Sequence, residues 1–227
     1  MSTAVGVMAG APLPGRCKPK LLAAYAPEWV AGLVAAMLRD TLDGLQWVSA
    51  EHYLVFVAPN DAGAEEDARA FDVLQRHVHA PWELLPQAAA DLGARVEHAF
   101  GVMFARGVSY ALLAASDAPS APTDALAEAS SDEATRREIL VGPNEDGGYH
   151  VIGMPHVEPR LMHDIPWSTT QVMETTRERC RERSLALREL PQWYAVDEPG
   201  DVLRLLDELR RHPERAPRTA QFLFTNA

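Results

Sequence analysis

The stretch Leu140-Val141-Gly142-Pro143-Asn144-Glu145-Asp146-Gly147-Gly148-Tyr149-His150-Val151-Ile152-Gly153-Met154 organises the rest of this chain. Two apolar runs, residues 139–141 and 150–154, predict short strands, and the loop between them holds a proline, two carboxylates and a glycine pair. Adjacent glycines allow positive φ angles and a close approach of the backbone to a ligand. The loop is therefore typical of a binding site, although a hairpin turn with solvated acids would have a similar composition.

The composition of the chain indicates its domain organisation and the kind of partner it can bind. The chain has 227 residues, of which 47% are apolar, and this predicts one large α/β domain over residues 1–227. Lys and Arg number 21 against 32 Asp and Glu, so the net charge is -11. Because contacts to a nucleic-acid backbone need a basic face, nucleic acid is not expected as the main partner. An anionic ligand would have to be held by a few basic groups, backbone N–H groups or a metal.

The cellular compartment is indicated by the cysteines and by the apolar segments. Cys17 and Cys180 are far apart and form no metal-ligand pattern, which favours a reducing compartment. No apolar run approaches the length of a membrane span, and the N-terminus lacks the features of a signal peptide. We therefore expect a cytoplasmic protein with no membrane partner.

Strands and helices are predicted to alternate along the chain. Strands are expected near residues 4–8, 53–58, 82–85, 110–115, 139–141, 150–154 and 185–190, and helices near 27–45, 62–77, 91–106, 122–131, 171–183 and 202–211. This alternation predicts a mostly parallel sheet with helices on both faces. The run 110–115 has no polar interruption, so we expect it to be the central strand. The tail after His212, with two prolines in five residues, is expected only to pack on the surface.

Four loops are expected at the carboxyl ends of the strands, where open α/β sheets bind their ligands. They contain Lys18 and Lys20 after the first strand, Asp117 after strand 110–115, Asp146 in the glycine loop, and Asp197 before the last helix. One site could gather all four.

Each of these residues also has an interpretation that involves no site. The two lysines can be ordinary surface residues, but behind the Gly/Pro-rich run 9–15 they are placed to meet the phosphates of a nucleotide. Asp117 can cap the next helix, yet Mg²⁺ also needs one or two protein carboxylates besides substrate phosphates. Of the two acids around Pro199, we expect Asp201 to cap the helix and Asp197 to approach Asp117 closely enough to share a cation.

The remaining aromatic and imidazole groups give weaker signals. His150, His156 and His163 form no metal-ligand spacing. We expect the ring of Trp167 to pack against other side chains rather than to stack on a base.

Several motifs occur in the order seen in the radical-SAM/selenodomain-associated transferases, which the chain resembles over nearly its whole length. The most specific is residues 142–149, Gly-Pro-Asn-Glu-Asp-Gly-Gly-Tyr; the others are residues 8–21, 86–95, 116–119, 165–169 and 196–201. That family looks like a branch of the glycosyltransferase-A-type fold, related to molybdenum cofactor guanylyltransferase and phospholactate guanylyltransferase.

The resemblance implies a transferase that uses a nucleotide-diphosphate-sugar donor, a small acceptor and Mg²⁺ or Mn²⁺. By position, Asp117 and Asp197 correspond to metal contacts, and Asp146 and Asp117 to the catalytic carboxylates. On the donor side the resemblance places Ala9, Gly15, Lys18, Lys20, Asp91 and Gly93. On the acceptor side it places Gly147, Gly148, Tyr149 and Trp167.

The chain also departs from the family pattern. It has Gly10 where a Lys is usual, Lys18-Pro19-Lys20-Leu21 for Lys-Thr-Arg-Leu, Ala115 for a Gly, and Ala195 for an Asp. Lys20 keeps the charge of the arginine without its bidentate fork, so diphosphate would be held less tightly. Two alternatives therefore stay open: a guanylyltransferase-like nucleotidyltransferase, and a relative that binds a nucleotide or a partner without turnover. The donor, the acceptor and the oligomeric state do not follow from the sequence.

Overall fold

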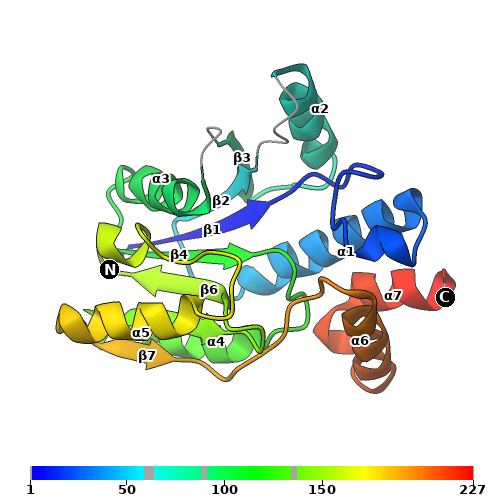
Figure 1. Cartoon of the computed structure of the whole chain (residues 1–227). Helices are drawn as coiled ribbons and strands as arrows, with labels where there is room; N and C mark the ends of the chain where they lie inside the picture. The colour runs from blue at the N-terminus through cyan, green and yellow to red at the C-terminus, as the bar shows by residue number, and fades with distance from the viewer. Residues whose placement is uncertain (1, 59–63, 88–90, 134–136, 227) are drawn as a thin grey trace.

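A seven-stranded sheet forms the centre of the computed structural model, which describes residues 2–58, 64–87, 91–133 and 137–226 (Figure 1). The strands are β1 (Thr3–Ala9), β2 (His52–Val57), β3 (Trp82–Pro86), β4 (Tyr110–Ala115), β5 (Ile139–Pro143), β6 (Tyr149–Met154) and β7 (Leu187–Glu189), in the order β3-β2-β1-β4-β6-β5-β7. β6 pairs antiparallel with both of its neighbours, and the other pairs are parallel. The sheet is mostly parallel and β4 is its middle strand, as predicted.

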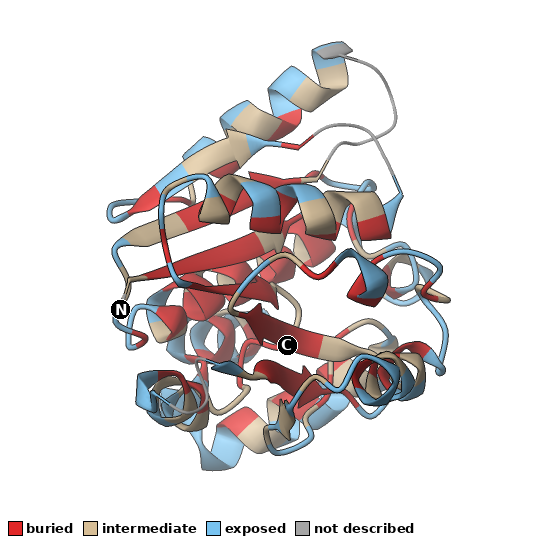
Figure 2. Cartoon of the chain, turned by 90° about the vertical axis from the view of Figure 1, so that its left-hand side faces the viewer, coloured by how far each residue is buried: buried red, intermediate tan, exposed pale blue. Residues whose placement is uncertain are grey.

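Helices cover both faces of the sheet. They are α1 (Pro27–Leu45), α2 (Ala64–Gln75), α3 (Leu92–Phe104), α4 (Thr123–Ser131), α5 (Val172–Glu182), α6 (Pro199–Arg211) and α7 (Pro217–Thr225). α3 and α5 pack on one face, and α1, α2 and α4 on the other. Figure 2 shows the result as buried strands between helices whose outer sides are exposed.

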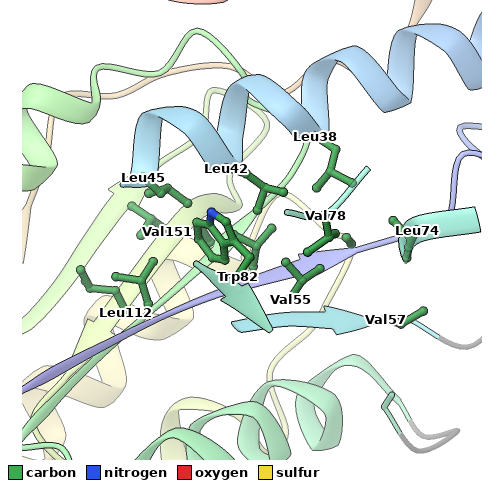
Figure 3. Packing of buried hydrophobic residues seen from close by; sticks show 14 of the residues in the cluster. Leu38, Leu42, Leu45, Val55, Val57, Leu74, Val78, Trp82, Leu112 and Val151 are labelled. Carbon is green, nitrogen blue, oxygen red and sulfur yellow. The ribbon is translucent and has the colours of Figure 1, made fainter. Parts of the chain in front are cut away.

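α1 takes part in two clusters of buried residues. Its leucines Leu38, Leu42 and Leu45 recur at helical spacing, so they point together at the sheet, where they meet β-strand residues and Trp82 (Figure 3). The opposite side of α1 packs against α6 and α7 in a separate cluster that includes Leu33, Val202, Leu205 and Leu223. No helix in the described part of the chain is long and apolar enough to cross a membrane.

The expectation for the C-terminal tail was wrong. Residues 217–225 form α7, which buries Thr219, Ala220 and Leu223. Its first backbone N–H groups, those of Arg218 and Thr219, donate to the buried carboxylate of Asp40 at 3.0 and 2.7 Å. Pro217 starts the helix, because proline at the first helical position loses no hydrogen bond. The prolines that suggested an irregular tail therefore mark a helix start.

Candidate functional site

One cavity of about 730 Å³ lies at the edge of the sheet where the strands β1, β4 and β5 end. Its wall includes Lys20, Asp117, Asp146 and Asp197, one from each of the four loops that the sequence placed at this edge. Parallel strands bring their carboxyl ends to one side, so residues separated by up to 177 positions meet without any local sequence signal. The roles of these residues remain predictions.

A cluster of two lysines and two aspartates occupies one end of the site. The Lys18 ammonium lies 2.9 Å from Asp117 Oδ2 and 3.4 Å from Asp197 Oδ1. The Lys20 ammonium lies 2.9 Å from Asp197 Oδ2 and 3.0 Å from Glu198 Oε1. Asp117 and Asp197 thus lie near one another, with their oxygens no farther apart than the sum of the two Lys18 distances. That they share a cation stays a prediction.

These contacts shift the pKa values of Lys18 and Asp197. Burial lowers the pKa of Lys18, but the charge and hydrogen bond of Asp117, together with Asp197, outweigh burial and raise the pKa above its usual value. For Asp197, burial favours a higher pKa, and the hydrogen bond from Lys20 with the charges of both lysines brings the pKa below its usual value. At neutral pH the cluster therefore holds two ammonium groups against carboxylates.

The loop before these lysines has an unusual backbone. Gly15 has φ = 73° and Lys18 has φ = 44°. A left-handed conformation is unfavourable for a residue with a Cβ, so surrounding contacts must hold Lys18 in it. The ion pairs with Asp117 and Asp197 supply such contacts.

The donor set fits a divalent cation only in part. Among the described residues there is no group of three His, Cys, Asp or Glu side chains arranged to hold a metal. Two carboxylates that already converge on one ammonium group do suit Mg²⁺ or Mn²⁺, provided that substrate phosphates complete the coordination. The binding of Mg²⁺ or Mn²⁺ at these carboxylates stays a prediction.

The glycine loop between β5 and β6 is built around Asp146. Its Oδ1 accepts a hydrogen bond of 2.9 Å from the Gly148 N–H, and the Asn144 N–H donates to the Gly148 carbonyl at 2.9 Å. Gly147 has φ = 86°, and a Cβ there would lie 2.2 Å from the carbonyl oxygen of Thr170. The loop therefore needs glycine at 147, and the close contact packs residues 168–170 against it.

Gly147→Ala should destabilise the protein by at least about 2 kcal/mol, because it adds a positive-φ penalty to a backbone clash. The melting temperature should fall by at least about 4 °C for a chain of this size. Gly148→Ala is the matched control, since its φ is not positive and its Cβ would meet only the Asp146 side chain, at 3.3 Å. Equal melting temperatures for the two variants in a thermal unfolding experiment would contradict this account of the loop.

Arg204 of α6 holds the same loop from outside. Its guanidinium makes two hydrogen bonds with the carboxylate of Glu145, at 2.5 and 2.7 Å, and also lies over the ring of Tyr194, 3.9 Å from its centroid. The hydrogen bond from Arg204 lowers the pKa of Glu145. Glu145 is thus a tether and Asp146 the acid that faces the cavity. No sequence pattern indicates this pair, because its two residues are 59 positions apart.

His150 and Asn144 form a second pair that the sequence did not predict. Both line the cavity, and His150 Nδ1 lies 2.9 Å from Asn144 Oδ1. Burial lowers the pKa of His150 to about 4, although the charge of Asp117 opposes the shift. His150 is therefore neutral at pH 7, and Asn144 Oδ1 accepts from its Nδ1–H. The position of His150 across the hairpin from Asn144 did not follow from the sequence.

Trp167 forms part of the cavity wall beside Tyr149. The two rings meet edge to face with centroids 6.0 Å apart, and the indole N–H donates to the Met162 carbonyl at 3.2 Å. A Cβ on Gly93 would lie 2.3 Å from that carbonyl oxygen and 2.8 Å from the indole nitrogen. Gly93 therefore permits the close packing of α3 against the loop that carries Trp167.

The other residues placed on the donor side lie outside the cavity wall. Ala9 ends β1 and is buried, and Gly15 is exposed in the turn before Lys18. Asp91 is the N-cap of α3, where its Oδ1 accepts from the Ala94 N–H at 2.9 Å. A nucleotide contact for Ala9, Gly15, Asp91 or Gly93 stays a prediction.

The structure shows whether Asp117, Asp197 and Asp201 cap the helices that follow them. α4 begins at Thr123 with Pro122 as its N-cap, so Asp117 is not the cap of that helix. Asp201 accepts from the backbone N–H groups of Asp197 and Glu198 at 3.0 and 2.8 Å and forms a capping box with Glu198. The prediction that Asp201 is the cap was therefore wrong: Glu198 is the N-cap of α6, and Asp201, at the third helical position, completes the capping box from inside the helix. Asp197 faces the cavity.

Comparison with solved structures supports the fold. A candidate nucleotide-diphospho-sugar transferase from Desulfovibrio desulfuricans G20 is similar over 100% of this chain and 96% of its own, with a TM-score of 0.86 and 27% sequence identity. More distant similarities include a cytidylyltransferase from Leptospira borgpetersenii (TM-score 0.54, 12% identity, 95% of this chain and 97% of that one). A third is 4-diphosphocytidyl-2C-methyl-D-erythritol synthase from Anaerococcus prevotii (TM-score 0.55, 11% identity, 92% and 96%). The fold is that of nucleotidyltransferases and glycosyltransferase-A-type enzymes.

At the level of sequence, no curated protein matches the chain. A family match does cover residues 41–169, more than half of the 227 residues, and includes β4, the glycine loop and Trp167. The chain therefore belongs to the DUF2064 family, described as uncharacterized proteins conserved in bacteria.

Proposed function

We propose that this protein is a metal-dependent glycosyltransferase that moves a sugar from a nucleotide-diphosphate donor to a small acceptor. The observation that carries the proposal is the convergence of Asp117, Asp197, Lys18 and Lys20 at one end of a cavity whose wall also contains Asp146. The similar protein from Desulfovibrio desulfuricans, named as a candidate nucleotide-diphospho-sugar transferase, supports the same class of donor. The motifs further favour the radical-SAM/selenodomain-associated branch and its kinship with the molybdenum cofactor and phospholactate guanylyltransferases.

Each charged residue of the site would have a separate role in the reaction. Lys18 and Lys20 exchange their carboxylate partners for the phosphate oxygens of the donor, which also bear negative charge. Asp117 and Asp197, released from the lysines, would hold Mg²⁺ or Mn²⁺. When bound, the cation neutralises the charge that develops on the leaving diphosphate. Asp146 orients the acceptor and takes its proton.

Nucleotidyl transfer is the second candidate, because the same cluster could bind a nucleoside triphosphate. The products distinguish the two reactions, since sugar transfer releases a nucleoside diphosphate and nucleotidyl transfer releases pyrophosphate. A first test is a thermal-shift screen of nucleoside diphosphates, triphosphates and nucleotide sugars, with and without Mn²⁺. Metal-dependent stabilisation followed by neither product would indicate a nucleotide-binding protein without turnover, and no stabilisation by any nucleotide would refute the proposal.

The position of Lys18 predicts that metal and diphosphate bind together. Its ammonium lies between the two carboxylates, so Mn²⁺ alone should bind weakly. A diphosphate that draws Lys18 away should strengthen Mn²⁺ binding by a factor within the roughly 5- to 150-fold typical of coupled sites, and Mn²⁺ should strengthen diphosphate binding by the same factor. Isothermal titration of each ligand in the presence and absence of the other measures this coupling.

Lys18→Met should bind Mn²⁺ alone more tightly than the wild type, because the competing ammonium is gone. Arg211→Met is the control, since Arg211 pairs with Asp207 on the surface of α6. Unchanged Mn²⁺ affinity in Lys18→Met would show that the two carboxylates are not the cation site.

A further inference from the structure

The cavity wall contains two chemically different groups of side chains, a charged group held by ion pairs and an apolar group. Lys20, Asp117 and Asp197 belong to the charged group, and the apolar group is made of Met8, Leu92, Val96, Leu113, Ile152 and Trp167. Val96, Leu113 and Ile152 belong to the core cluster between α3 and the sheet, against which Met8 and Trp167 pack. The apolar part of the cavity is therefore a place where this core reaches the surface.

The two groups are separated along β4. Leu113 lies in the strand, and Asp117 follows it by four residues. At about 3.3 Å per residue of extended chain, the separation is up to roughly 13 Å. A diphosphate bound near Asp117 would leave the apolar part free for another molecule or for another part of the same molecule.

Hydrogen-bonding capacity decides between these possibilities. A nucleobase or a sugar carries several donors and acceptors, which lose free energy when they are buried without partners. Five of the six apolar residues offer no polar side-chain group apart from a thioether, and the indole N–H of Trp167 already donates to the Met162 carbonyl. Tyr149 packs against Trp167 in the same wall, and its buried hydroxyl makes no hydrogen bond with the described residues, so it could serve one polar group of a ligand. The hydroxyl-bearing residues Ser168, Thr169 and Thr170 of the wall are exposed. An apolar ring or alkyl body fits this part of the cavity better than a base or a sugar.

We infer that the acceptor is an alcohol or phenol carried on an apolar, ring-sized body, with the body between Trp167 and Leu92 and its hydroxyl at Asp146. The inference rests on the proposed function. Asp146 Oδ1 accepts from the Gly148 N–H, and Oδ2 makes no hydrogen bond with the described residues. Trp167 presents its indole ring, and Leu92 at the start of α3 is exposed by 37%. An aromatic body would gain burial and ring contacts here.

The step is balanced without a further reactant. The acceptor oxygen forms a bond to the anomeric carbon of the sugar while the bond from that carbon to the diphosphate oxygen breaks. The hydroxyl proton passes to Asp146, and the bonding electron pair leaves with the nucleoside diphosphate. Lys18 and Lys20 lie where that negative charge accumulates.

The test compares named probes by saturation-transfer NMR. With the nucleoside diphosphate that gives the largest thermal shift and Mn²⁺ present, 4-nitrophenol and cyclohexanol should bind more tightly than glycerol and glucose. Leu92→Gln should weaken 4-nitrophenol binding by roughly 10-fold, because it removes an apolar contact, and should leave nucleotide affinity unchanged. Leu203→Gln is the control: Leu203 is also an exposed helix leucine, at 62%, but it lies on α6 away from the cavity wall.

Some results of this experiment would overturn the apolar acceptor alone, and another would overturn the proposed function as well. Equal binding of glucose and 4-nitrophenol, or equal losses in Leu92→Gln and Leu203→Gln, would overturn the apolar acceptor. Displacement of 4-nitrophenol by the nucleotide, with weakened nucleotide binding in Leu92→Gln, would place the base in the apolar part and also overturn it. If no nucleotide binds, the proposed function fails, and the inference fails with it.

Discussion

Replacing Asp117 by asparagine is expected to abolish metal-dependent binding of a nucleoside diphosphate and, with it, transfer. Asp117 faces the cavity, approaches Asp197 and caps no helix. A cation held by both acids would act in the ground state as well as in the transition state, so affinity and turnover should fall together. Loss of several kcal/mol of charge stabilisation corresponds to roughly 10³-fold or more in rate.

Asparagine is the better replacement at this position because its side-chain oxygen can still accept the hydrogen bond from Lys18, which is largely buried. Asp207→Asn is the matched control, since Asp207 lies on the surface of α6 and pairs with Arg211. Calorimetric titration with the nucleoside diphosphate and Mn²⁺ gives the affinity, and release of the diphosphate from the donor sugar gives the turnover. Wild-type metal dependence in Asp117→Asn would remove Asp117 from the cation site.

Asp146→Asn should behave differently, because Asp146 is proposed to act on the acceptor. Asparagine can keep the hydrogen bond from the Gly148 N–H, so the loop should keep its shape. Donor affinity should stay within about 2-fold of the wild type, while kcat falls by roughly 10²-fold or more for loss of a general base. An acid that is merely solvated in a turn would change neither quantity.

The same two measurements separate these cases. Glu174→Gln serves as the control, since Glu174 lies on α5 in exposed pairs with Arg177 and Arg181. Wild-type kcat in Asp146→Asn would exclude Asp146 from the mechanism and leave Gly147 and Gly148 as a structural turn. A large loss of donor affinity would instead move Asp146 to the donor side.

Three of the positions at which this chain departs from the transferases that its sequence resembles can be located in the structure. Ala115 and Ala195, which stand where the transferases that the sequence resembles usually have Gly and Asp, both line the cavity. An aspartate at position 195 would add a carboxylate to the wall that already contains Asp117, Asp146 and Asp197. A Cβ at position 10 would meet no atom of the described residues within 4 Å.

The sequence by itself determined the order of the strands along the chain, the order of the helices up to α6, and the identity of the central strand. These follow from local patterns: an uninterrupted apolar run marks residues 110–115, and helical spacing marks α1. Alternation of strands and helices then limits the sheet to a mostly parallel one. The four loops of the site could be named for the same reason, because parallel strands bring their carboxyl ends together.

Only the tertiary structure decided which side chains meet within those loops. The contact of Lys18 with both aspartates, the tether from Arg204 to Glu145 and the pairing of His150 with Asn144 depend on how separate segments pack. The same holds for Gly93, whose lack of a side chain matters because Met162 and Trp167 lie against it. α7 was missed because Pro217 marks a helix start only if the residues after it find an apolar surface, and that surface belongs to α1. The propensity for a helix or a strand depends on neighbouring residues, whereas the tertiary contacts that stabilise it come from residues far away in the chain.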